Sequence, residues 1–369
     1  MSEPSADTYA LKSSASPDIA APTLPYLPPM PLHYRPRIGV IGAGGIVAAH
    51  LDAYRTAGWE VAAICNRSLA KAEARAREFA PMARVTARYE DILADVTIDV
   101  VDVTLHPADR LTVIEAALQA GKHVLSQKPF VLDLDDGERL VQIARDRGVR
   151  LAVNQNGRWA PHLAYMREAV RAGLVGEVLS AHVSIHWNHG WIAGTLFERI
   201  EDLILYDFGI HWFDFIASLG GARAESVFAM AGPALGQKAK APLMAQVLLR
   251  RPGGQASLIF DGGAPYGPRD TSFVAGTQGS LQSDGPDLGS QTVTLTTAEG
   301  RAQPVLYGTW FNDGFRGAMG ALLVAIEQDA EPANGAAENL HSLALAFAAI
   351  QSRRTGREVA IGAARNLEL

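Results

Sequence analysis

The stretch Arg37-Ile38-Gly39-Val40-Ile41-Gly42-Ala43-Gly44-Gly45-Ile46-Val47 decides the fold of this chain. Its first five residues form an apolar strand pattern, and a helical pattern follows from Ile46 to Ala57. Between them, Gly42 permits a tight turn and Gly44 lets the main chain approach a ligand closely. Exposed amides at the start of a helix hold anions, so the stretch predicts a site for the pyrophosphate of a dinucleotide. We expect this site to comprise Gly42, Gly44, Gly45 and Ile46.

Short apolar runs and helical patterns alternate along the chain as far as residue 156. Strands separated by helices of this length form a parallel sheet that is covered on both faces. We therefore expect residues 36–156 to be a doubly wound dinucleotide-binding domain, a Rossmann domain. The predicted strands are 37–41, 61–65, 84–86, 99–105, 123–127 and 150–154, and the predicted helices are 46–57, 69–79, 111–120 and 135–147.

The rhythm changes after Asn156, where strand patterns follow one another without helices between them. The segment Val178–Trp187 ends in strict alternation of apolar and polar residues, which is the pattern of a half-buried strand. We expect residues 157–369 to form an α/β domain with a mostly antiparallel open sheet. Its further strands are predicted at 226–230, 244–249, 256–260 and 292–296, and its closing helices at 315–328 and 336–353.

Residues 1–35 form a separate zone that is rich in proline. Proline disfavours helix and removes main-chain donors, so an extended arm is expected. A loose tail is the favoured interpretation, since termini are usually mobile unless something holds them. The alternative is an arm that lies across a neighbouring subunit, with apolar anchors at Tyr26, Leu27, Met30 and Tyr34.

The composition limits the class of protein. Hydrophobic residues make up 48% of the 369 and charged residues 20%, which is enough apolar content for a packed core. The net charge of −6 argues against nucleic acid as the main partner. The single cysteine, Cys65, excludes an internal disulfide, and no apolar run approaches the roughly 20 residues that span a bilayer. Because the N-terminus lacks a secretory signal, we expect a soluble cytoplasmic protein without membrane contact.

The end of the second predicted strand carries the residues expected to contact the adenosine ribose. An acidic residue at this place binds the 2′-hydroxyl of NAD and repels the 2′-phosphate of NADP. This chain has Asn66, Arg67 and Ser68 instead. Because arginine pairs with phosphate and serine adds a hydroxyl donor, these residues favour NADP(H), with NAD(H) left open.

Two segments carry the candidate catalytic residues. Asp207, His211 and Asp214 are spaced by four and then three residues, so a helix places them on one face. A histidine with a carboxylate one turn away can exchange a proton near neutral pH. Lys128 directly follows the fifth strand, at the edge of the sheet where doubly wound folds bind ligands. The alternative for His211 is a partly buried histidine with satisfied hydrogen bonds, and the alternative for Lys128 is a solvated surface lysine.

An aromatic segment holds His182, His186 and His189 together with Trp187 and Trp191. On a strand only His182 and His186 share a face, so we expect no metal site. Tryptophan rings suit the apolar faces of sugars. We therefore expect His186 and Trp191 to contact a sugar-like substrate or to lie at an interface.

Several motifs, taken in order along the chain, resemble the Gfo/Idh/MocA oxidoreductases, the family of glucose–fructose oxidoreductase and inositol dehydrogenase. The likeness extends from about Arg37 to the end of the chain, and the ordered series is far more specific than any one motif. The motifs are Gly42–Ile46, Ala120–Pro129, Asn156–Pro161, Gly173–Val178, Asp207–Asp214, Ala349–Ser352 and Thr355–Val359.

The resemblance implies a Rossmann domain followed by a C-terminal domain that binds substrate and whose open sheet makes oligomer contacts, so we expect a homo-oligomer, a dimer or a tetramer. It also implies a nicotinamide cofactor and a sugar, sugar derivative or polyol as substrate. The lysine of the family's Glu-Lys-Pro motif falls on Lys128, and its Asp/His pair falls on Asp207 and His211. Asn156 and Arg158 are candidates to bind the substrate, with ordinary packing at the domain junction as the alternative for Arg158.

The chain departs from the family's pattern beside the expected nicotinamide site. Gln127 replaces the usual glutamate, and Arg110 stands where histidine is usual. Leu105-His106-Pro107 stands where Thr-Pro-Asn is common. We expect the bound cofactor to be bordered by Leu105, His106, Gln127 and Lys128.

The predicted reaction is hydride transfer between nicotinamide C4 and a carbinol carbon. Lys128 and His211 handle the hydroxyl proton and stabilise the alkoxide, with the direct acid or base left open between them. Asp207 orients His211 or binds a neighbouring hydroxyl. Two alternatives are a non-catalytic protein that senses NADP(H) or scaffolds an assembly, and a redox-neutral sugar hydrolase or epimerase that holds its cofactor tightly.

Overall fold

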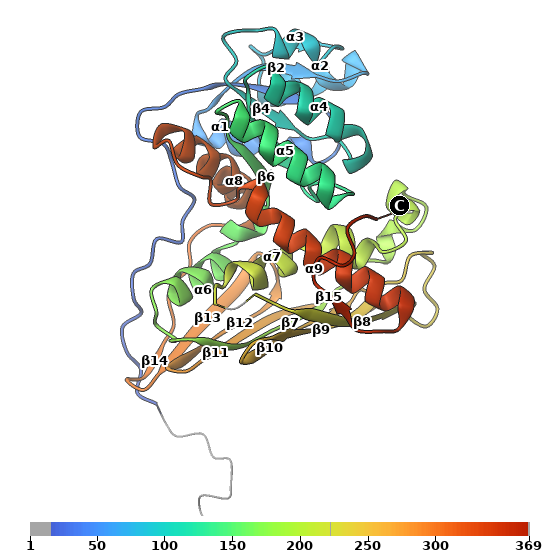
Figure 1. Cartoon of the computed structure of the whole chain (residues 1–369). Coiled ribbons are helices and arrows are strands. Elements are labelled where there is room, and N and C mark those ends of the chain that lie inside the picture. Colours follow the sequence, from blue (N-terminus) through green and yellow to red (C-terminus); the bar gives the residue numbers. More distant parts are fainter. Residues whose placement is uncertain (1–15, 222, 368–369) are drawn as a thin grey trace, which may run out of the picture.

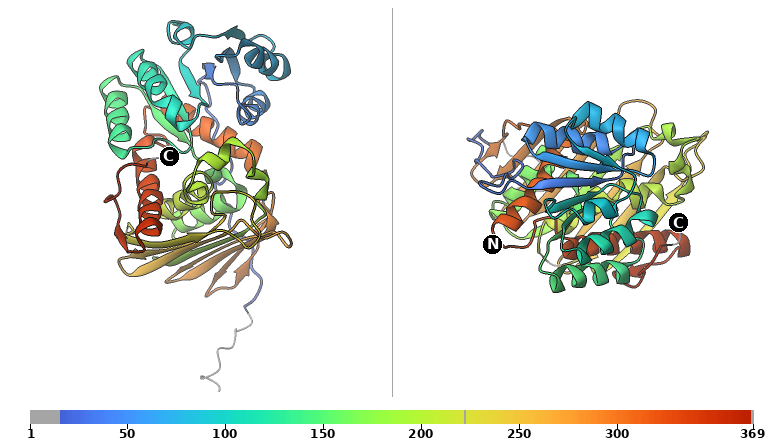
Figure 2. Two further views of the ribbon diagram at one scale, coloured as in Figure 1. Left: turned by 90° about the vertical axis from the view of Figure 1, so that its right-hand side faces the viewer. Right: turned by 90° about the horizontal axis from the view of Figure 1, so that it is seen from above.

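The computed structural model describes residues 16–221 and 223–367. They form an α/β part, at the top in Figure 1, and a large sheet below it that carries helices on one face. Figure 2 shows the same arrangement from the side and from above. No helix among the described residues is both long enough and apolar enough to cross a bilayer.

The first part is a six-stranded parallel sheet with the order β3-β2-β1-β4-β5-β6. The order reverses between β1 and β4, which is the switch point where such sheets bind ligands at their carboxyl edge. The predicted Rossmann sheet is confirmed. Its strands are β1 (Arg37–Ile41), β2 (Glu60–Cys65), β3 (Arg84–Thr86), β4 (Val100–Val103), β5 (His123–Gln127) and β6 (Leu151–Asn154). Its helices are α1 (Val47–Ala57), α2 (Leu69–Phe79), α3 (Glu90–Leu93), α4 (Pro107–Gln119) and α5 (Leu134–Asp146).

The second sheet has nine strands in the order β14-β13-β12-β11-β7-β10-β9-β8-β15. Neighbouring strands are antiparallel except β7 and β10, which run parallel. The predicted mostly antiparallel sheet is confirmed. Its strands are β7 (Val178–His186), β8 (Ser226–Gly232), β9 (Met244–Arg251), β10 (Gly254–Asp261), β11 (Arg269–Gly276), β12 (Gly279–Asp287), β13 (Ser290–Thr297), β14 (Arg301–Ala302) and β15 (Val359–Ala360).

Two of these strands, β11 and β12, have sequences that do not predict them. Their buried positions include Asp270, Ser272 and Ser283, so the apolar half of the strand pattern is interrupted. Gly285 and Pro286 near the end of β12 are typical of turns. Pairing with neighbours on both sides holds the two strands in the sheet despite these side chains.

Helices cover one face of the second sheet and leave the other face open (Figure 1). The covering helices are α6 (Pro161–Arg171), α7 (Ile210–Ser218) and α9 (Ala336–Thr355). On β7, Val183 and Ile185 point to the covered face and are buried. The open face exposes six large apolar side chains, each 36–60% accessible, namely Phe228, Met230, Met244, Leu248, Ile259 and Phe273.

The helix α8 (Trp310–Glu327) returns from the second sheet to the first part of the molecule. Its buried residues Phe315 and Met319 belong to one apolar cluster with Ile38 of β1 and Leu51 of α1. The next helix, α9, packs against both α5 and α7. The predicted boundary at residue 156 therefore separates two stretches of sequence. In space, α8 and α9 from the second stretch pack against helices of the first.

The proline-rich arm lies against its own chain over the residues that the structure describes. Ile19 donates its main-chain N–H to Arg301 O at 2.9 Å, beside the edge strand β14. Further on, the Glu327 carboxylate at the end of α8 accepts the main-chain N–H groups of residues 32–34 at 2.6–2.9 Å. The arm thus runs along one side of the molecule from the second sheet to α8 (Figure 1). The loose-tail interpretation is wrong for this part, and residues 1–15 lie outside the described residues.

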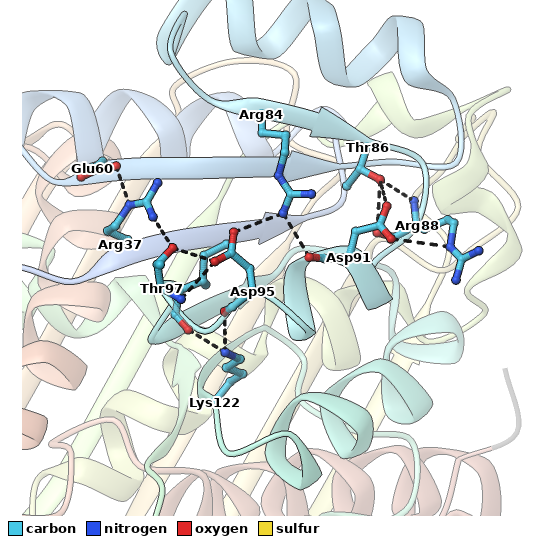
Figure 3. Close-up of polar contacts among 10 residues, drawn as sticks. Arg37, Glu60, Arg84, Thr86, Arg88, Asp91, Asp95, Thr97 and Lys122 are labelled. Carbon is cyan, nitrogen blue, oxygen red and sulfur yellow. Dashed lines mark hydrogen bonds and ion pairs between the residues drawn. The ribbon is translucent and has the colours of Figure 1, made fainter.

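A polar network fastens the amino edge of the Rossmann sheet (Figure 3). Lys122 Nζ donates to Asp95 O and Ile98 O, both at 2.8 Å, just before β4. Arg84 donates to Asp91 O of α3 at 3.0 Å and to Asp95 Oδ2 of the same loop at 3.3 Å. Lys122 is therefore a structural residue, and this network lies at the edge opposite to the glycine turn.

Candidate active site

The glycine turn joins β1 to α1 with a geometry that fits a dinucleotide. Gly42 has a φ of 117°, and a Cβ on it would lie 2.4 Å from Thr104 Oγ1, so only glycine fits there. A Cβ on the exposed Gly44 or Gly45 would meet nothing within 4 Å. Ile46 directly precedes α1, whose first amides lack helical acceptors. The turn therefore offers open main chain and free donors to a pyrophosphate.

Asn66 connects the end of β2 to the glycine turn. Its Oδ1 accepts the main-chain N–H of Ala43 at 3.2 Å, and its Nδ2 donates to Ser68 O at 3.0 Å. Ser68 itself stands at the start of α2 and makes no capping hydrogen bond with its side chain. Asn66 thus holds the glycine turn through its side-chain hydrogen bonds. The Ser68 hydroxyl does not cap α2 and can bind a ligand group.

Two arginines lie near the glycine turn, Arg67 after β2 and Arg75 on α2. The Arg67 side chain is 91% exposed and lies 3.8 Å from Asp109 Oδ2. Arg75, on α2, approaches Gly44 O at 3.5 Å. Arg75 also lies 3.4 Å from Glu78 Oε2, so each of the two guanidinium groups has a carboxylate nearby.

The end of β4 borders the same turn. Thr104 Oγ1 donates to Ile41 O at 3.2 Å. Leu105 Cδ2 would lie 3.4 Å from a Cβ at Gly42, so the Leu105 side chain flanks the turn. His106 is exposed at the start of α4. Leu105 and His106 therefore lie beside the glycine turn, where the sequence predicts the cofactor to bind.

Lys128 follows β5 and reaches across to the second part of the molecule. Its Nζ donates to the main-chain O of Asp207 at 2.9 Å and lies 3.2 Å from Asp207 Oδ2. Each of the two side chains is 15% exposed. The peptide bond between Lys128 and Pro129 is cis. This ion pair joins the carboxyl edge of the Rossmann sheet to a single π-helical turn, η5 (Ile204–Phe208).

Arg110 lies beneath this loop and is a residue whose role the sequence does not reveal. It is 1% exposed, and it donates to Pro129 O at 2.7 Å. Burial lowers the pKa of its guanidinium to about 10, against the opposing influence of Tyr206 and Asp207. The signal in the sequence is that Arg110 stands where the family usually has histidine, but its partner Pro129 lies in a different loop, after β5.

His211 stands on α7, directly after the π-helical turn. Its ring packs edge-on against Trp310, with ring centres 5.3 Å apart. Burial, and secondly the Lys128 ammonium, hold the pKa of His211 well below its usual range, so the imidazole is uncharged at neutral pH. Its Nδ1 is buried and finds no hydrogen-bond partner among the described residues. The structure thus brings together Lys128, Asp207 and His211.

Arg158 and Asp214 are not part of this group. Arg158 Nε and Nη2 donate to the two carboxylate oxygens of Asp214 at 2.7 and 2.8 Å, and a third donor binds Ala333 O. Ser342 Oγ donates to Asp214 at 2.9 Å as well. The pair ties the turn η2 (Asn156–Trp159) to α7. The structure gives Arg158 the packing role that was the alternative to substrate binding.

His186 lies on the open face of the second sheet, away from the catalytic group. Its cross-strand partners are Asp261 and Arg269, and its Nε2 lies 2.7 Å from Ser184 Oγ on the same face. His211, by contrast, is on a helix of the covered face. The expectation that His186 contacts the substrate is therefore corrected, because strand alternation turns its side chain outward.

Asn156 and Trp191 lie closer to the group. Asn156 Oδ1 accepts from Trp310 Nε1 at 3.0 Å, so it holds the ring that packs on His211. Trp191 is 55% exposed, and its ring lies 6.2 Å from that of Phe208, the residue after Asp207. Trp191 therefore stands at the rim of the site. In residues 16–221 and 223–367, no three His, Cys, Asp or Glu side chains are arranged to hold a metal ion.

Comparison with known families and proteins agrees with this arrangement. Residues 36–155 match a family described as an oxidoreductase family with an NAD-binding Rossmann fold. Residues 163–282 match the C-terminal domain of the same family. The chain belongs to the Gfo/Idh/MocA oxidoreductases. Its N-terminal sheet is thus an NAD-binding Rossmann domain.

Relatives of this oxidoreductase cover nearly its whole length. Inositol 2-dehydrogenase of Rhizobium meliloti is 27% identical over 333 residues, 88% of this chain and 99% of the relative. The 1,5-anhydro-D-fructose reductase of Ensifer adhaerens is 30% identical over 342 residues, 88% and 98% of the two chains. An oxidoreductase from Agrobacterium radiobacter, solved with NAD+, L-tartaric acid and magnesium, superposes with a TM-score of 0.80. It is 22% identical and covers 89% of this chain and 99% of its own, so it shows the shared fold.

Proposed function

We propose that this oxidoreductase transfers hydride between NAD(P) and a carbinol carbon of a sugar, sugar derivative or polyol. The observation that carries the proposal is the contact of Lys128 with Asp207, beside His211, at the carboxyl edge of the Rossmann sheet. Binding a dinucleotide requires none of these three side chains. The names of two relatives, a dehydrogenase of inositol and a reductase of 1,5-anhydro-D-fructose, support the substrate class.

The residues have complementary roles in this reaction. When bound, the nicotinamide ring supplies the hydride acceptor or donor. Lys128, held by Asp207, donates a hydrogen bond to the substrate oxygen and stabilises the negative charge that develops on it. His211 is uncharged at neutral pH and accepts the hydroxyl proton. Because its Nδ1 is buried, the exchanging atom is Nε2.

NADP(H) is the favoured cofactor. The position that carries a ribose-binding acid in NAD enzymes is occupied by Asn66, whose amide is engaged with the glycine turn. Arg67 is exposed beside it, and Arg75 lies against the turn. A 2′-phosphate would meet two guanidinium groups, which would exchange their contacts with Asp109 and Glu78 for the phosphate, and position 66 would supply no negative charge to repel it.

The aromatic rim suits a sugar-like substrate. Trp191, Phe197 and Phe208 have ring centres 5.6–6.2 Å apart, next to Asp207. An exposed tryptophan face can stack on the apolar C–H surface of a sugar, while Lys128 and Asp207 supply polar contacts. We assign Trp191 to this stacking role.

We also propose a homo-oligomer, a dimer or a tetramer, that assembles through the open face of the second sheet. The register aligns Phe228 with Leu248 across β8 and β9, and Phe273 lies on the same face of β11. Large apolar side chains gathered on a sheet face are typical of a protein interface. A second copy of the same face would cover them and would place His186 at the interface.

The test is a binding measurement followed by a turnover measurement on the full chain. Fluorescence titration with NADPH and NADH gives the two dissociation constants, and the oxidised cofactor is then supplied with a panel of sugars and polyols. Formation of reduced cofactor with a member of the panel supports the proposal. Binding without turnover favours the sensor. A non-redox product, formed with cofactor that stays bound through purification, favours the hydrolase or epimerase.

A further inference from the structure

A buried hydrogen-bond network lies directly behind Lys128 and takes no part in the proposed reaction. Its members come from four elements of the Rossmann part: His50 and Tyr54 on α1, Asp102 on β4, Gln127 on β5 and Asn154 on β6. Gln127 is 5% exposed, and the other four are fully buried. Polar side chains in such surroundings need defined partners, because an unsatisfied buried group is costly.

The orientation of the Gln127 amide follows from an unambiguous donor. The main-chain N–H of Lys128 can only donate, and its acceptor is Gln127 Oε1 at 2.7 Å. Asn154 Nδ2 lies 3.2 Å from the same oxygen. The other end of the amide, Nε2, therefore faces His50 Nε2 at 3.1 Å. An amide NH₂ group has no lone pair to accept with, so it must donate to the imidazole.

The tautomer of His50 follows in turn. Because its Nε2 accepts from Gln127, with Asn154 Nδ2 also at 3.1 Å, this nitrogen carries no proton. The ring proton is then on Nδ1, which lies 2.8 Å from Asp102 Oδ2. Tyr54 donates its hydroxyl to the same carboxylate oxygen at 2.7 Å. Asp102 Oδ2 thus accepts two hydrogen bonds, Oδ1 has no partner among the described residues, and the donors assign His50 the neutral Nδ1–H tautomer.

We propose that Gln127 and His50 are positioning residues for Lys128, and that the neutral amide of Gln127 keeps His50 in its uncharged Nδ1–H form. The donors all point one way, from the Lys128 main chain through Gln127 and His50 to Asp102, and each bond polarises the next. Arg110 holds the other side of the same loop through Pro129 O at 2.7 Å. The main chain around Lys128 is therefore held from both sides while its ammonium group reaches Asp207.

A glutamate in place of Gln127 would reverse the direction of the hydrogen bond between residue 127 and His50 Nε2. Its second oxygen would present a lone pair to His50 Nε2, which would have to carry a proton. His50 would then be an imidazolium between two carboxylates, with Phe315 of α8 packed edge-on at 4.7 Å. At high pH the imidazolium would lose its proton, and two acceptors would oppose each other. The Gln127→Glu variant is therefore expected to make the position of Lys128 sensitive to pH.

The first test does not depend on any substrate. Nitrogen-15 NMR of the ten histidines in the full chain, with His50 assigned by the signal lost in His50→Gln, reports which ring nitrogens carry protons. We expect His50 at neutral pH to carry one proton, on Nδ1, and to carry two in Gln127→Glu. A proton on Nε2 in the unmodified protein overturns the inference and leaves the proposed hydride transfer standing.

The second test rests on the proposed function and separates positioning from folding. The Gln127 side chain, which the sequence predicts to border the cofactor, is 5% exposed and has both ends of its amide engaged within the network. Gln127→Met keeps the length of the side chain and removes the amide, so we expect kcat to fall about 10- to 100-fold with the cofactor dissociation constant changed less than about 2-fold. Gln127→Glu is expected to retain more activity at low pH and to lose it as pH rises. Gln351→Met, on an exposed position of α9, is the matched control. Unchanged kcat in Gln127→Met, or a Gln127→Glu profile parallel to that of the unmodified protein, contradicts the proposal. If Gln127→Met does not fold, the NMR result alone decides.

Discussion

Lys128 and Asp207 hold each other at 3.2 Å in a place where each side chain is only 15% exposed. An ion pair on an open surface contributes little, but one at a partly dry junction is screened less and keeps a defined geometry. The same ammonium also helps to keep His211 uncharged. One residue therefore organises the other two, which makes Lys128 the first target for mutation.

We expect Lys128→Met to lower kcat about 100-fold or more and to change cofactor affinity little, because the substrate oxygen loses the ammonium group that stabilises its developing negative charge. The measurement is steady-state turnover beside a fluorescence titration of NADPH. Lys238→Met, at an exposed position in a loop of the second part, is the control. Turnover equal to that of the unmodified protein would remove Lys128 from the reaction.

Arg67 tests the cofactor preference. Removing an arginine that contacts phosphate weakens binding by a charge-assisted hydrogen bond, so Arg67→Ala should raise the dissociation constant of NADPH about 10-fold. The constant for NADH should change far less, since that cofactor lacks the 2′-phosphate. Arg88→Ala, another exposed arginine of the same part, serves for comparison. Equal weakening of both cofactors would argue against a 2′-phosphate site at Arg67.

At this scale, sequence patterns predict the residues whose signal is local. Lys128 follows a strand, the spacing of Asp207 and His211 indicates one helical turn, and the motifs of the resembling family fall on all three residues. The structure divides Asp207 and His211 between the π-helical turn η5 and α7. Arg158 and His186 were harder to assign, because their partners Asp214 and Asp261 lie far away along the chain. The network of His50 and Asp102 was missed for the same reason: a buried polar residue in a strand gains meaning only when its neighbour is known.

Among the elements, β11 shows most clearly where an apolar pattern fails. Asp270 and Ser272 lie opposite Ile185 and Val183 on the covered face. Asp270 is fully buried, and neither carboxylate oxygen has a hydrogen-bond partner among the described residues. Burial accordingly raises the pKa of Asp270 from 3.8 to about 7. The fold tolerates this group by favouring its protonated form.

The pH dependence of stability follows from this shift. Because the folded-state pKa is the higher one, the stabilising contribution of protonated Asp270 is complete below the unfolded-state value of 3.8 and is lost as pH rises through about 7. Asp270→Asn should therefore gain roughly 3–4 kcal/mol of unfolding free energy at mildly alkaline pH, and the gain should shrink in acid. Denaturant unfolding at several pH values measures it. Asp18→Asn, at an exposed carboxylate, should show no such gain. If Asp270→Asn is no more stable than the unmodified protein at mildly alkaline pH, the argument is refuted.

The helix α8 marks a second limit of prediction from sequence at the level of elements. Its apolar stripe identifies a helix but not the surface that it covers, which here is α1 and β1 of the first part. The proline-rich arm is similar, since proline density predicts extended chain but not the carboxylate of Glu327 that receives it. Long-range packing partners decide both cases.

For the molecule as a whole, the open sheet face exposes six large apolar side chains of the second sheet. Leu248 is 60% exposed at the centre of β9, between Phe228 of β8 and Ser257 of β10. We expect Leu248→Glu to shift the protein toward the monomer, because two buried carboxylates would face each other across a two-fold interface. Analytical ultracentrifugation measures the change. Leu235→Glu, in an exposed loop, should leave the assembly intact, and an unmodified protein that is already monomeric would contradict the interface.

In the proposed reaction the two parts of the chain supply one site, with Lys128 from the first and His211 from the second. A double-mutant cycle on kcat/KM with Lys128→Met and His211→Asn tests it most directly. Residues that act on the same hydroxyl are strongly coupled, so the double variant should be about as impaired as the worse single variant. If the two losses multiply instead, Lys128 and His211 act independently and the shared site is refuted.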